Sequence, residues 1–328
     1  MGLKRYTARR IAWAGVVALL ILTITFVLLE LAPDSQLARV QFRAAASGES
    51  AEAAADAYAR RRGLDGPLWE RYLEYLANLA SGDWGWSDTR SQPVAEAILT
   101  ALPYSLMYTV PAVLVSTTLG IAIGLYSAFN QYTKADYAAT FVAFFGVSIP
   151  NFWFGIVLLL LFAVYLGWVP VLFDAELART RTFSLANARQ LALPVFVLAT
   201  SAIASTMRYA RAEALEYVRA AFVKTARAKG AHEWRVLTRH VLRPTLVPLS
   251  TILVGDLLGV VLSASYLVEV VFGIPGLGRL SLEAIRRQDT ALVLGTTLVP
   301  VFVAVIGNLL QDLAYAVLDP RIEYGDRR

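Results

Sequence analysis

The stretch from Arg208 to Pro248 reads RYARAEALEYVRAAFVKTARAKGAHEWRVLTRHVLRPTLVP and is the most densely charged segment of a strongly apolar chain. It carries nine Lys or Arg residues against three Asp or Glu residues. Along its first half, apolar side chains recur at helical spacing and basic side chains occupy the other sides. The apolar set is Leu215, Val218, Phe222 and Ala226, and the basic set is Arg211, Arg219, Lys224 and Arg227. The pattern predicts an amphipathic helix with a basic, solvated flank.

The second half of this stretch predicts a turn and a shorter helix. Gly230 tolerates the left-handed conformation that ends helices, and the charge of Lys229 suits the C-terminal end of a helix dipole. A second helix is expected over residues 233–243, because Pro244 removes a backbone donor and restricts the residue before it. Residues 208–247 therefore form a predicted helix–turn–helix elbow between two apolar runs of membrane-spanning length.

Composition places the bulk of the chain in a lipid bilayer. Of its 328 residues, 57% are hydrophobic and 17% are charged, and the net charge is +5. In a bilayer, only helices or closed barrels satisfy the backbone polar groups, and these apolar runs are far too long for barrel strands. The basic residues cluster beside the apolar runs, which favours cytoplasmic loops over a nucleic-acid-binding surface. The sequence therefore predicts an all-α membrane protein.

The residue types exclude several kinds of site. The chain has no cysteine, which rules out disulfides, zinc–thiolate sites and thiol catalysis. The two histidines, His232 and His240, are too few for a histidine-rich metal site. Acids within the apolar runs are isolated, whereas a membrane enzyme needs paired carboxylates or metal ligands. We expect no catalytic residue, no bound cofactor and no metal in this chain.

Six apolar runs predict six transmembrane helices. The runs lie at about 11–29, 98–129, 137–173, 191–207, 246–268 and 290–311. The first is long for the apolar region of a signal peptide and no convincing cleavage site follows it, so we expect a retained helix. The third exceeds one span, which predicts an interfacial or re-entrant part. The positive charge of the elbow places it in the cytoplasm with both termini, although the seven arginines of residues 33–97 argue weakly against this orientation.

These runs divide the chain into three parts. Residues 1–32 hold the N-terminal segment and the first span, residues 33–97 form a polar extracytoplasmic insertion, and residues 98–328 form a core of five spans that includes the elbow. Within the insertion, residues 44–62 are alanine-rich, with acids early and arginines late, an order that suits a helix dipole. Residues 68–79 have an amphipathic pattern. Both segments are predicted helices.

The elbow resembles the EAA loop of ABC-importer permeases, and in particular their dipeptide, oligopeptide and nickel branch. In that family the loop docks into a groove of a cytoplasmic ATPase. The resemblance assigns ATPase coupling to Lys224, Thr225, Ala226, Arg227, Ala228, Lys229 and Gly230, with His240 and Pro248 at matching positions. The sequence departs from the branch at His232, where a capping Ser is common, and at Pro244, where Asn is common. Taken alone, the stretch is also compatible with a basic juxtamembrane loop.

A second match follows the fifth apolar run. Residues 269–278, EVVFGIPGLG, resemble the branch pattern Glu-x-x-Phe-x-x-Pro-Gly-x-Gly-Arg through Glu269, Phe272, Pro275, Gly276 and Gly278. We expect the last two glycines, beside the proline, to form a fixed extracytoplasmic turn and to bring the backbone close to another chain. A phosphate-binding glycine loop is excluded, because no Gly-Lys-Ser/Thr follows and the segment is extracytoplasmic.

Weaker matches extend the resemblance over nearly the whole chain. Residues 82–87, GDWGWS, resemble a Gly-Asp-aromatic-Gly-x-Ser signature of the branch, although their tryptophans are equally typical of interfacial anchors. Residues 146–152, GVSIPNF, resemble its Ser-Ile-Pro-x-Phe segment, and residues 308–322 resemble its C-terminal sequence. The resemblance is weakest over residues 33–80.

Three polar residues are candidates for the translocation pathway, namely Ser148, Asn151 and Asp256. Asp256 follows Pro248 by eight residues and so lies ~12 Å along a helix, where a charge is costly unless it faces water or a partner. It either attracts the ammonium group of a substrate or takes part in helix packing as a hydrogen-bonded or protonated acid. The hydroxyl of Ser148 has a comparable alternative, in which it satisfies a carbonyl freed in a proline-kinked helix.

The resemblance implies a permease subunit with the type I ABC-importer architecture. With a second permease it would form a pathway for peptides or similar small solutes that an extracytoplasmic binding protein delivers, and two cytoplasmic ATPase subunits would bind ATP and Mg. The chain has no Walker A lysine pattern, so ATP hydrolysis is expected in the partners. The implied location is the plasma or inner membrane, with no nucleic-acid partner. The alternative is a gated channel or secondary transporter, which would need neither an ATPase nor a basic elbow.

Overall fold

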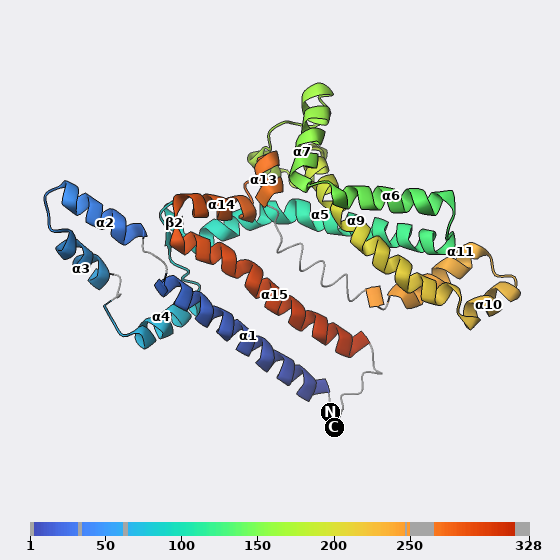
Figure 1. Ribbon diagram of the computed structural model, residues 1–328, viewed down its shortest axis with the longest axis horizontal. Helices are drawn as coiled ribbons and strands as arrows, with labels where there is room; N and C mark the ends of the chain where they lie inside the picture. The colour runs from blue at the N-terminus through green and yellow to red at the C-terminus, as the bar shows by residue number, and fades with distance from the viewer. Residues whose placement is uncertain (1–2, 32–34, 62–64, 247, 250–265, 319–328) are drawn as a thin grey trace. The chain divides into compact units, whose positions relative to one another are not determined.

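The computed structural model describes residues 3–31, 35–61, 65–246, 248–249 and 266–318 (Figure 1). Helices make up most of these residues. The chain divides into two compact units. Unit 1 comprises residues 1–99, 283–305 and 324–328, and unit 2 comprises residues 100–282 and 306–323.

Unit 1 contains the N-terminal helix and the polar insertion. Its elements are α1 (Leu3–Leu31), α2 (Ser35–Ala46), α3 (Ala51–Arg61), α4 (Leu68–Ser81), β1 (Trp86–Ser87), β2 (Gln92–Pro93), the start of α5 (Val94–Phe129), the end of α14 (Leu277–Arg287) and the first part of α15 (Thr290–Leu318). β1 and β2 form an antiparallel pair. The predicted helix over 68–79 is confirmed as α4. The single helix predicted over 44–62 is wrong, because Gly48, with a φ of 77°, separates α2 from α3.

The amphipathic helix α4 is held against the C-terminal part of α1. The hydroxyls of Thr23 and Tyr72 form a hydrogen bond of 2.6 Å, and the guanidinium of Arg71 lies 2.5 Å from the carboxylate of Glu30. The rings of Tyr72 and Tyr75 both contact Phe26. These contacts fix α4 beside the end of a long apolar helix.

Unit 2 holds the remaining helices. They are α6 (Lys134–Ser148), α7 (Asn151–Leu159), the π-helical turn η1 (Leu160–Tyr165), α8 (Ala175–Thr180), α9 (Leu185–Val218), α10 (Ala221–Ala228), α11 (Glu233–Arg235), the π-helical turn η2 (Val236–Leu242) and α13 (Tyr266–Phe272), with the longer parts of α5 and α14 and the end of α15. α6 lies alongside α9 (Figure 1). Side-chain caps begin four of these helices. Thr133 accepts the N–H of Asp136 and Asp174 accepts that of Leu177. Ser184 accepts the N–H of Asn187 and His232 accepts that of Trp234.

Small residues allow α5 and α9 to approach closely. A methyl group on Gly124 would lie 2.6 Å from the carbonyl oxygen of Met207 and 2.7 Å from Cβ of Ala210. One turn earlier, a methyl group on Gly120 would lie 2.6 Å from Cβ of Thr206. Close backbone contact at small residues is a common way for helices to associate in membranes, where burial of apolar surface drives little association.

Four helical segments among the described residues are long and apolar enough to cross a membrane: Thr7–Leu28, Val94–Phe129, Leu185–Val218 and Thr290–Leu309. A fifth candidate is the pair Lys134–Gly146 and Asn151–Tyr165, which is bent by 96°. This break agrees with the prediction that the third apolar run is more than one straight span. The predicted fifth run, 246–268, lies largely outside the described residues, so the number six stays a prediction. The structure confirms a mostly helical protein with several membrane-spanning candidates.

Candidate functional site

The first half of the elbow, residues 208–229, contains parts of two helices, α9 and α10, rather than the single helix predicted there. α9 continues without interruption from the predicted fourth span to Val218, and the chain then turns at Arg219 and Ala220. Ala220 is extended, with φ −64° and ψ 150°, and α10 begins directly after it. The predicted helix is therefore wrong at this point. Regular apolar spacing continued across the turn and concealed it.

One face of α10 packs against the chain's own core. Val223 and Ala226 are buried, and Val223 joins a hydrophobic cluster with Leu125 and Ala128 of α5, Ala214 of α9, and Val236 and Val241 of η2. Phe222 is 48% exposed, so its predicted place on the buried face is wrong. The exposed face carries Lys224, Thr225, Ala228 and Lys229. Of the predicted coupling set, Ala226 therefore faces inward, because the buried stripe of this short helix passes through Val223 and Ala226.

Gly230 ends α10 in the left-handed conformation, as predicted, with a φ of 79°. The N–H of Gly230 donates to the carbonyl of Arg227 over 2.9 Å, and the N–H of Ala231 donates to the carbonyl of Ala226 over 3.1 Å. These two bonds form a Schellman motif, which satisfies the last free carbonyls of the helix. The direction in which the chain leaves α10 is therefore determined by backbone hydrogen bonds.

His232 caps the next helix, at the position where the family branch commonly has Ser. Its Nδ1 accepts the N–H of Trp234 over 3.2 Å. α11 passes into η2, and the backbone stays helical to residue 246, so the prediction that Pro244 ends this helix is wrong. The π-helical turn η2 ends at Leu242, two residues before the proline, and the helix continues through Pro244.

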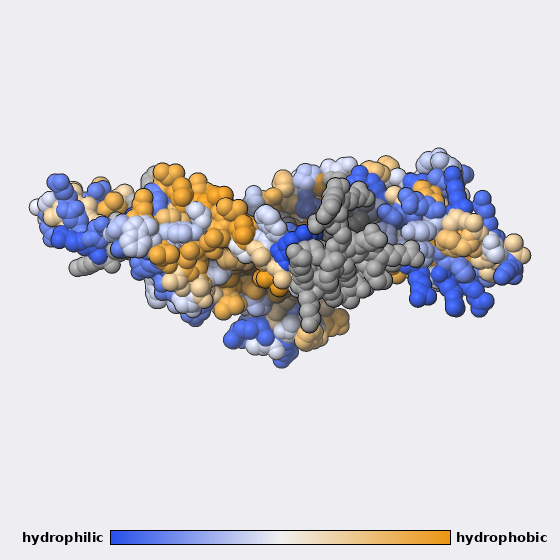
Figure 2. All heavy atoms as spheres, turned by 90° about the horizontal axis from the view of Figure 1, so that it is seen from below, coloured by the Kyte–Doolittle hydropathy of each residue, from blue (hydrophilic) through white to orange (hydrophobic). Residues whose placement is uncertain are grey.

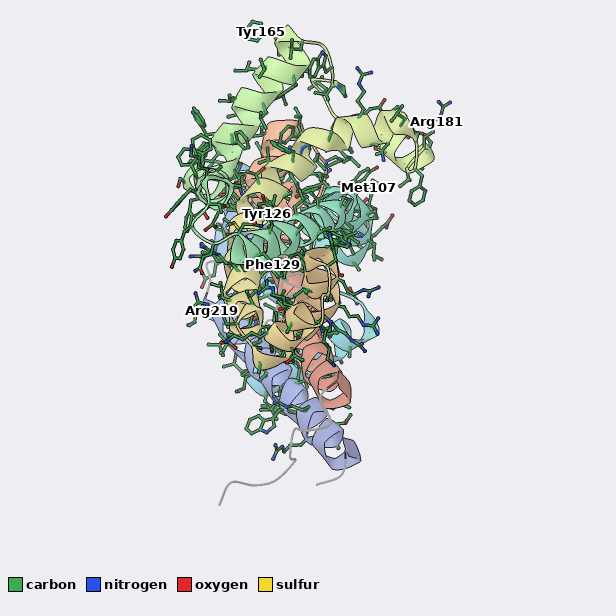
Figure 3. The ribbon with its side chains drawn as sticks, turned by 90° about the vertical axis from the view of Figure 1, so that its right-hand side faces the viewer. Met107, Tyr126, Phe129, Tyr165, Arg181 and Arg219 are labelled. Carbon is green, nitrogen blue, oxygen red and sulfur yellow. The ribbon has the colours of Figure 1, made fainter. Side chains whose placement is uncertain are left out.

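Arg227 of α10 forms an ion pair with Glu233 of α11 and so connects these two helices. Its Nε and a terminal guanidinium nitrogen each lie 3.0 Å from a carboxylate oxygen of Glu233, and its guanidinium carbon lies 5.2 Å from the ring centre of Phe129. The guanidinium of Arg219 donates to the side-chain oxygen of Gln131 over 3.2 Å. Figure 3 labels Phe129 and Arg219. The elbow is thus attached to the end of α5 and to the loop that follows it.

A buried ion pair lies at the base of the elbow. Asp136 is 2% exposed, and its carboxylate accepts hydrogen bonds from the hydroxyl of Ser127, the N–H of Tyr132 over 2.9 Å and the guanidinium of Arg211 over 2.9 Å. Arg211 was predicted to lie on a solvated flank, but its side chain is only partly exposed, at 26%, and pairs with the buried Asp136. Asp136 lies at the end of a short polar turn, directly before the apolar run 137–173. An acid at this place in the sequence could have indicated that it needs a basic partner. The pair connects α6 with α9.

The predicted extracytoplasmic turn surrounds a second buried carboxylate. Glu269 is fully buried, and one of its oxygens accepts hydrogen bonds from the hydroxyls of Ser105 (2.7 Å) and Tyr108 (3.0 Å). Its other oxygen accepts the N–H of Arg279 over 2.7 Å, and the N–H of Gly278 also donates to this carboxylate. Burial raises the pKa of Glu269 above its ordinary value, while hydrogen bonds from Ser105, Arg279, Tyr108 and Gly278 oppose the rise.

The glycines of this turn serve contacts within the chain. Gly276 lies so close to Glu269 that a methyl group would overlap the carboxylate, and it would also lie 2.5 Å from Oγ of Ser105. The left-handed residue of the turn is Gly273, with a φ of 71°, rather than Gly276. On the side where a side chain of Gly276 would point, the chain's own Glu269 and Ser105 fill the space, and approach of the backbone to another chain stays a prediction.

Two further residues support the turn. Phe272 is buried, and its ring would lie 3.1 Å from a methyl group placed on Gly155 of α7. Pro275 is partly buried and precedes the start of α14 at Leu277, whose N–H donates to Ser105 over 2.8 Å. Ser105 and Tyr108 come from α5, so the turn is fixed to a membrane-spanning helix. Sequence reasoning missed both residues, because single hydroxyls in an apolar run give no distinct signal.

Comparisons with known proteins identify the chain. The model of the family "Binding-protein-dependent transport system inner membrane component" matches residues 120–324, which include the elbow and the turn at Glu269. The chain belongs to this family. The permease is 35% identical to the oligopeptide transport system permease protein AppB of Bacillus subtilis, over 97% of this chain and 99% of that protein. It is 32% identical to the oligopeptide permease OppB of Haemophilus influenzae, over 98% of this chain and 99% of the relative.

A third relative is the di/tripeptide transport system permease protein DppB of Pseudomonas aeruginosa, which is 34% identical over 80% of the permease and 83% of that protein. Family membership and the apolar helices together make this chain a multi-pass membrane protein of a binding-protein-dependent transport system. Its residues 1–119, which contain the insertion, lie outside the part that the family model matches.

Two of the three predicted pathway residues, Ser148 and Asn151, lie among the described residues of the permease, on either side of Pro150. The hydroxyl of Ser148 donates to the carbonyl of Phe144 over 2.9 Å, and the side-chain amide of Asn151 lies 3.4 Å from the hydroxyl of Ser201. Asp256 lies outside the described residues. The bond of Ser148 is of the kind expected for a hydroxyl that satisfies a backbone carbonyl beside a proline break.

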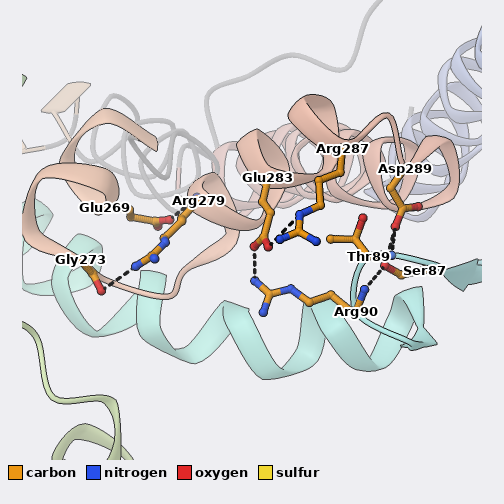
Figure 4. A network of polar contacts seen from close by, with 9 residues as sticks. All are labelled: Ser87, Thr89, Arg90, Glu269, Gly273, Arg279, Glu283, Arg287 and Asp289. Carbon is orange, nitrogen blue, oxygen red and sulfur yellow. Dashed lines mark hydrogen bonds and ion pairs between the residues drawn. The ribbon is translucent and has the colours of Figure 1, made fainter.

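A polar network connects the β1–β2 hairpin of the permease with α14 and the residue before α15 (Figure 4). Asp289 accepts the hydroxyl of Ser87 over 2.7 Å and the N–H of Thr89 over 2.9 Å, and Arg90 lies 2.6 Å from Glu283. Burial alone would raise the pKa of Asp289, but hydrogen bonds from Ser87, Thr89 and the N–H of Leu292 outweigh it and lower the pKa. Ser87, the last residue of the GDWGWS segment, thus has a structural role. Throughout the described part of the permease, no three His, Asp or Glu side chains are placed to hold a metal ion.

Proposed function

We propose that this permease is one of two membrane subunits of an ATP-driven importer for peptides, with six transmembrane helices and with its elbow and both termini in the cytoplasm. The single observation that carries the coupling role is the elbow: α10 is anchored on one face and open on the other. Buried Val223 and Ala226 hold it to the core, whereas Lys224, Thr225, Ala228 and Lys229 face outward. A helix with a firmly packed inner face and an uncovered outer face suits the transmission of movement between subunits.

The outer face of the elbow is basic. Hydrophilic side chains gather around α10 and α11 (Figure 2, right). The exposed basic residues of the elbow are Arg219, Lys224, Lys229, Arg235 and Arg239. This charge supports docking into a groove with acidic residues at its rim. The partner is an ATPase subunit, in which ATP and Mg bind and hydrolysis takes place. A small side chain at Ala228 allows close approach of the two backbones.

Movement would pass from the elbow to the membrane helices through packed contacts. The cluster of Val223 with Leu125 and Ala128 joins α10 to the last turn of α5, and Arg227 and Arg219 contact the segment that follows it. ATP-driven closure of the ATPase subunits would shift α10 and tilt α5 and α9, and the pathway would open outward to the loaded binding protein. Packed elements of this kind move as rigid bodies rather than deforming continuously.

The names of the relatives support a peptide as the substrate class, because three permeases of 32–35% identity are named for oligopeptide or di/tripeptide transport. The remaining subunits would be a second permease, two ATPase subunits and an extracytoplasmic binding protein. Ser148, Asn151 and Asp256 remain candidates for the pathway between the two permeases. A midplane aspartate there would attract the ammonium group of a peptide.

Cysteine crosslinking in the assembled importer tests this proposal. The chain has no cysteine, so single cysteines at Ala228 and at Phe183, which is fully exposed, report on one position each. We expect the cysteine at 228 to crosslink to an ATPase subunit, and the one at 183 to react with a membrane-impermeant maleimide added from outside. Labelling of 183 only from the cytoplasmic side would overturn the orientation. Peptide uptake by proteoliposomes that lack the ATPase subunits would favour the channel or secondary-transporter alternative.

A further inference from the structure

The amphipathic helix α4 has one side packed against the protein and two exposed sides of opposite character. Tyr72, Leu76 and Leu79 are partly buried and form the packed side. The exposed residues form two rows, each with the four-residue spacing of neighbours on a helix surface. The apolar row consists of Trp69, Leu73 and Ala77, and the polar row consists of Glu70, Glu74 and Asn78.

The N-terminal half of α4 is fixed to the end of a membrane-spanning candidate, beside the C-terminal end of α1 (Figure 1). The hydroxyl of Tyr72 forms a hydrogen bond with that of Thr23, and Arg71 pairs with Glu30. The candidate span in α1 is Thr7–Leu28, so its last two turns and the residues just beyond it hold α4. These 22 residues form a helix ~33 Å long, close to the thickness of the hydrocarbon core. The start of α4 therefore lies at the membrane boundary.

The C-terminal half of α4 lies beside the start of another span. Asn78 and Leu79 line one pocket together with Ala291 and Leu294, which belong to the first turns of the candidate span Thr290–Leu309. The end of one span and the start of another are therefore on the same side of the membrane, and α4 contacts both. A helix held at both of its ends at this level lies along the membrane boundary.

The exposed apolar surface of α1 continues onto the apolar row of α4. In α1, Ile24 and Leu28 lie one turn apart near the contact with α4 and are 58% and 62% exposed. Trp69 and Leu73 of α4 are 62% and 56% exposed. The apolar surface of a spanning helix faces acyl chains, and tryptophan is enriched where those chains meet the headgroups. The lipid around α1 therefore also reaches the apolar row.

We propose that α4 is an interfacial helix, which inserts Trp69 and Leu73 among the acyl chains at the membrane boundary and keeps Glu70 and Glu74 in the adjoining water. A helix that lies in this plane needs one apolar side and one charged side, as α4 has. Because the charged residues of the polar row are acids, apolar contact rather than attraction to anionic headgroups supplies the binding. The contact holds the polar insertion against the membrane surface.

Spin labels on single cysteines test this proposal. The chain has no cysteine, so Trp69→Cys, Glu70→Cys, Leu73→Cys and Glu74→Cys each report on one position. The purified permease, with the subunits that co-purify with it, is placed in nanodiscs of phosphatidylcholine, and the cysteine-free parent corrects for labels on those subunits. Power saturation measures the collisions of each nitroxide with oxygen, which concentrates in the bilayer, and with a polar nickel chelate, which stays in water.

We expect the ratio of oxygen to nickel accessibility to be roughly tenfold higher at positions 69 and 73 than at 70 and 74, because hydrocarbon excludes polar solutes. Leu20→Cys, in the exposed apolar surface of α1, is the reference for lipid. Glu52→Cys, at an exposed position of α3, is the reference for water. High nickel accessibility at all four positions of α4 would show that water surrounds the helix. Low accessibility to both reagents at 69 and 73 would show that a partner protein covers the row. Either result would overturn the proposal.

A substitution within the apolar row tests its part in the insertion. With the nitroxide at Ala77→Cys, Leu73→Glu should lower the ratio several-fold, because a carboxylate in the row opposes its burial in acyl chains. Leu73 is more than half exposed, so this change removes little packing within the chain. Glu74→Gln is the matched control and should leave the ratio unchanged, as should replacement of phosphatidylcholine by phosphatidylglycerol. An unchanged ratio in Leu73→Glu would also refute the proposal. No readout depends on transport, so the result is independent of the proposed function.

Discussion

The carboxylate of Glu269 occupies the space that a methyl group on Gly276 would need. The two residues lie seven positions apart, on either side of the bend between α13 and α14. Ser105 of α5 contacts both sides of this bend, because its hydroxyl donates to Glu269 and accepts the N–H of Leu277. The glycine is therefore required by a buried acid of the same chain.

Gly276→Ala should destabilise the permease. The added methyl overlaps Glu269 and lies 2.5 Å from Oγ of Ser105, and both groups are held by further hydrogen bonds. Overpacking of this kind costs about 1–3 kcal/mol. Thermal unfolding of the detergent-solubilised protein measures the loss. Gly15→Ala is the control, because nothing lies within 4 Å of a methyl placed there. Equal melting temperatures for the two variants would contradict the expectation.

Glu269→Gln should change the pH dependence of stability. The pKa of this acid is raised in the folded state, so its favourable contribution is complete below the unfolded value of about 4.5 and is lost as pH rises through the folded pKa. We expect the parent to lose stability through this group as pH rises above about 4.5, and the variant to lack that component. Melting temperatures across this range measure it. Parallel curves for parent and variant would show that Glu269 does not titrate there.

Arg211→Gln should weaken the base of the elbow. The substitution leaves the carboxylate of Asp136, which is 2% exposed, without its positive partner, although Ser127 and the N–H of Tyr132 still donate to it. Because Arg211 is 26% exposed, solvent screens the pair, and we expect a loss of about 1–3 kcal/mol rather than the full cost of a buried charge.

Asp136→Asn combined with Arg211→Gln should recover part of that loss, since no charge then remains buried. A double-mutant cycle on unfolding free energies measures the coupling. Arg179→Gln provides a matched control, because its ion pair with Glu176 is 70% and 68% exposed and should contribute little. Additive effects at 211 and 136 would show that the two residues act independently.

Gly230→Val should uncouple ATP hydrolysis from transport while leaving membrane insertion intact. A β-branched residue at a φ of 79° costs ~1–2 kcal/mol of strain and would redirect the chain between α10 and α11. Gly230→Asn is the informative control, because asparagine tolerates this conformation and should retain most of the activity. Peptide uptake and ATPase activity are measured in proteoliposomes that contain all subunits. Normal uptake by the valine variant would refute the role of this turn.

Local patterns in the sequence predicted local structure well. The Gly230 helix end, α4 and the long apolar helices all follow from contacts between residues a few positions apart, and spacing and residue type encode such contacts. The same locality explains the errors. Helical spacing of apolar residues continued across the turn at Arg219 and Ala220, so the turn was not predicted. The helix also continues through Pro244 after a π-helical turn that no residue pattern predicts.

By itself, the sequence determined that this chain is a helical membrane protein with a basic elbow whose first helix ends at Gly230. Only the tertiary structure decided that Ala226 faces inward, that Arg211 meets Asp136, and that Gly276 makes room for Glu269. The reason is physical. Helix formation and termination depend on neighbouring residues, whereas burial depends on which distant helix covers a given face. Asp136 pairs with Arg211, which is 75 positions away, and Ser105 bonds to Glu269, which is 164 positions away. No local spacing of residues in the sequence records such partners.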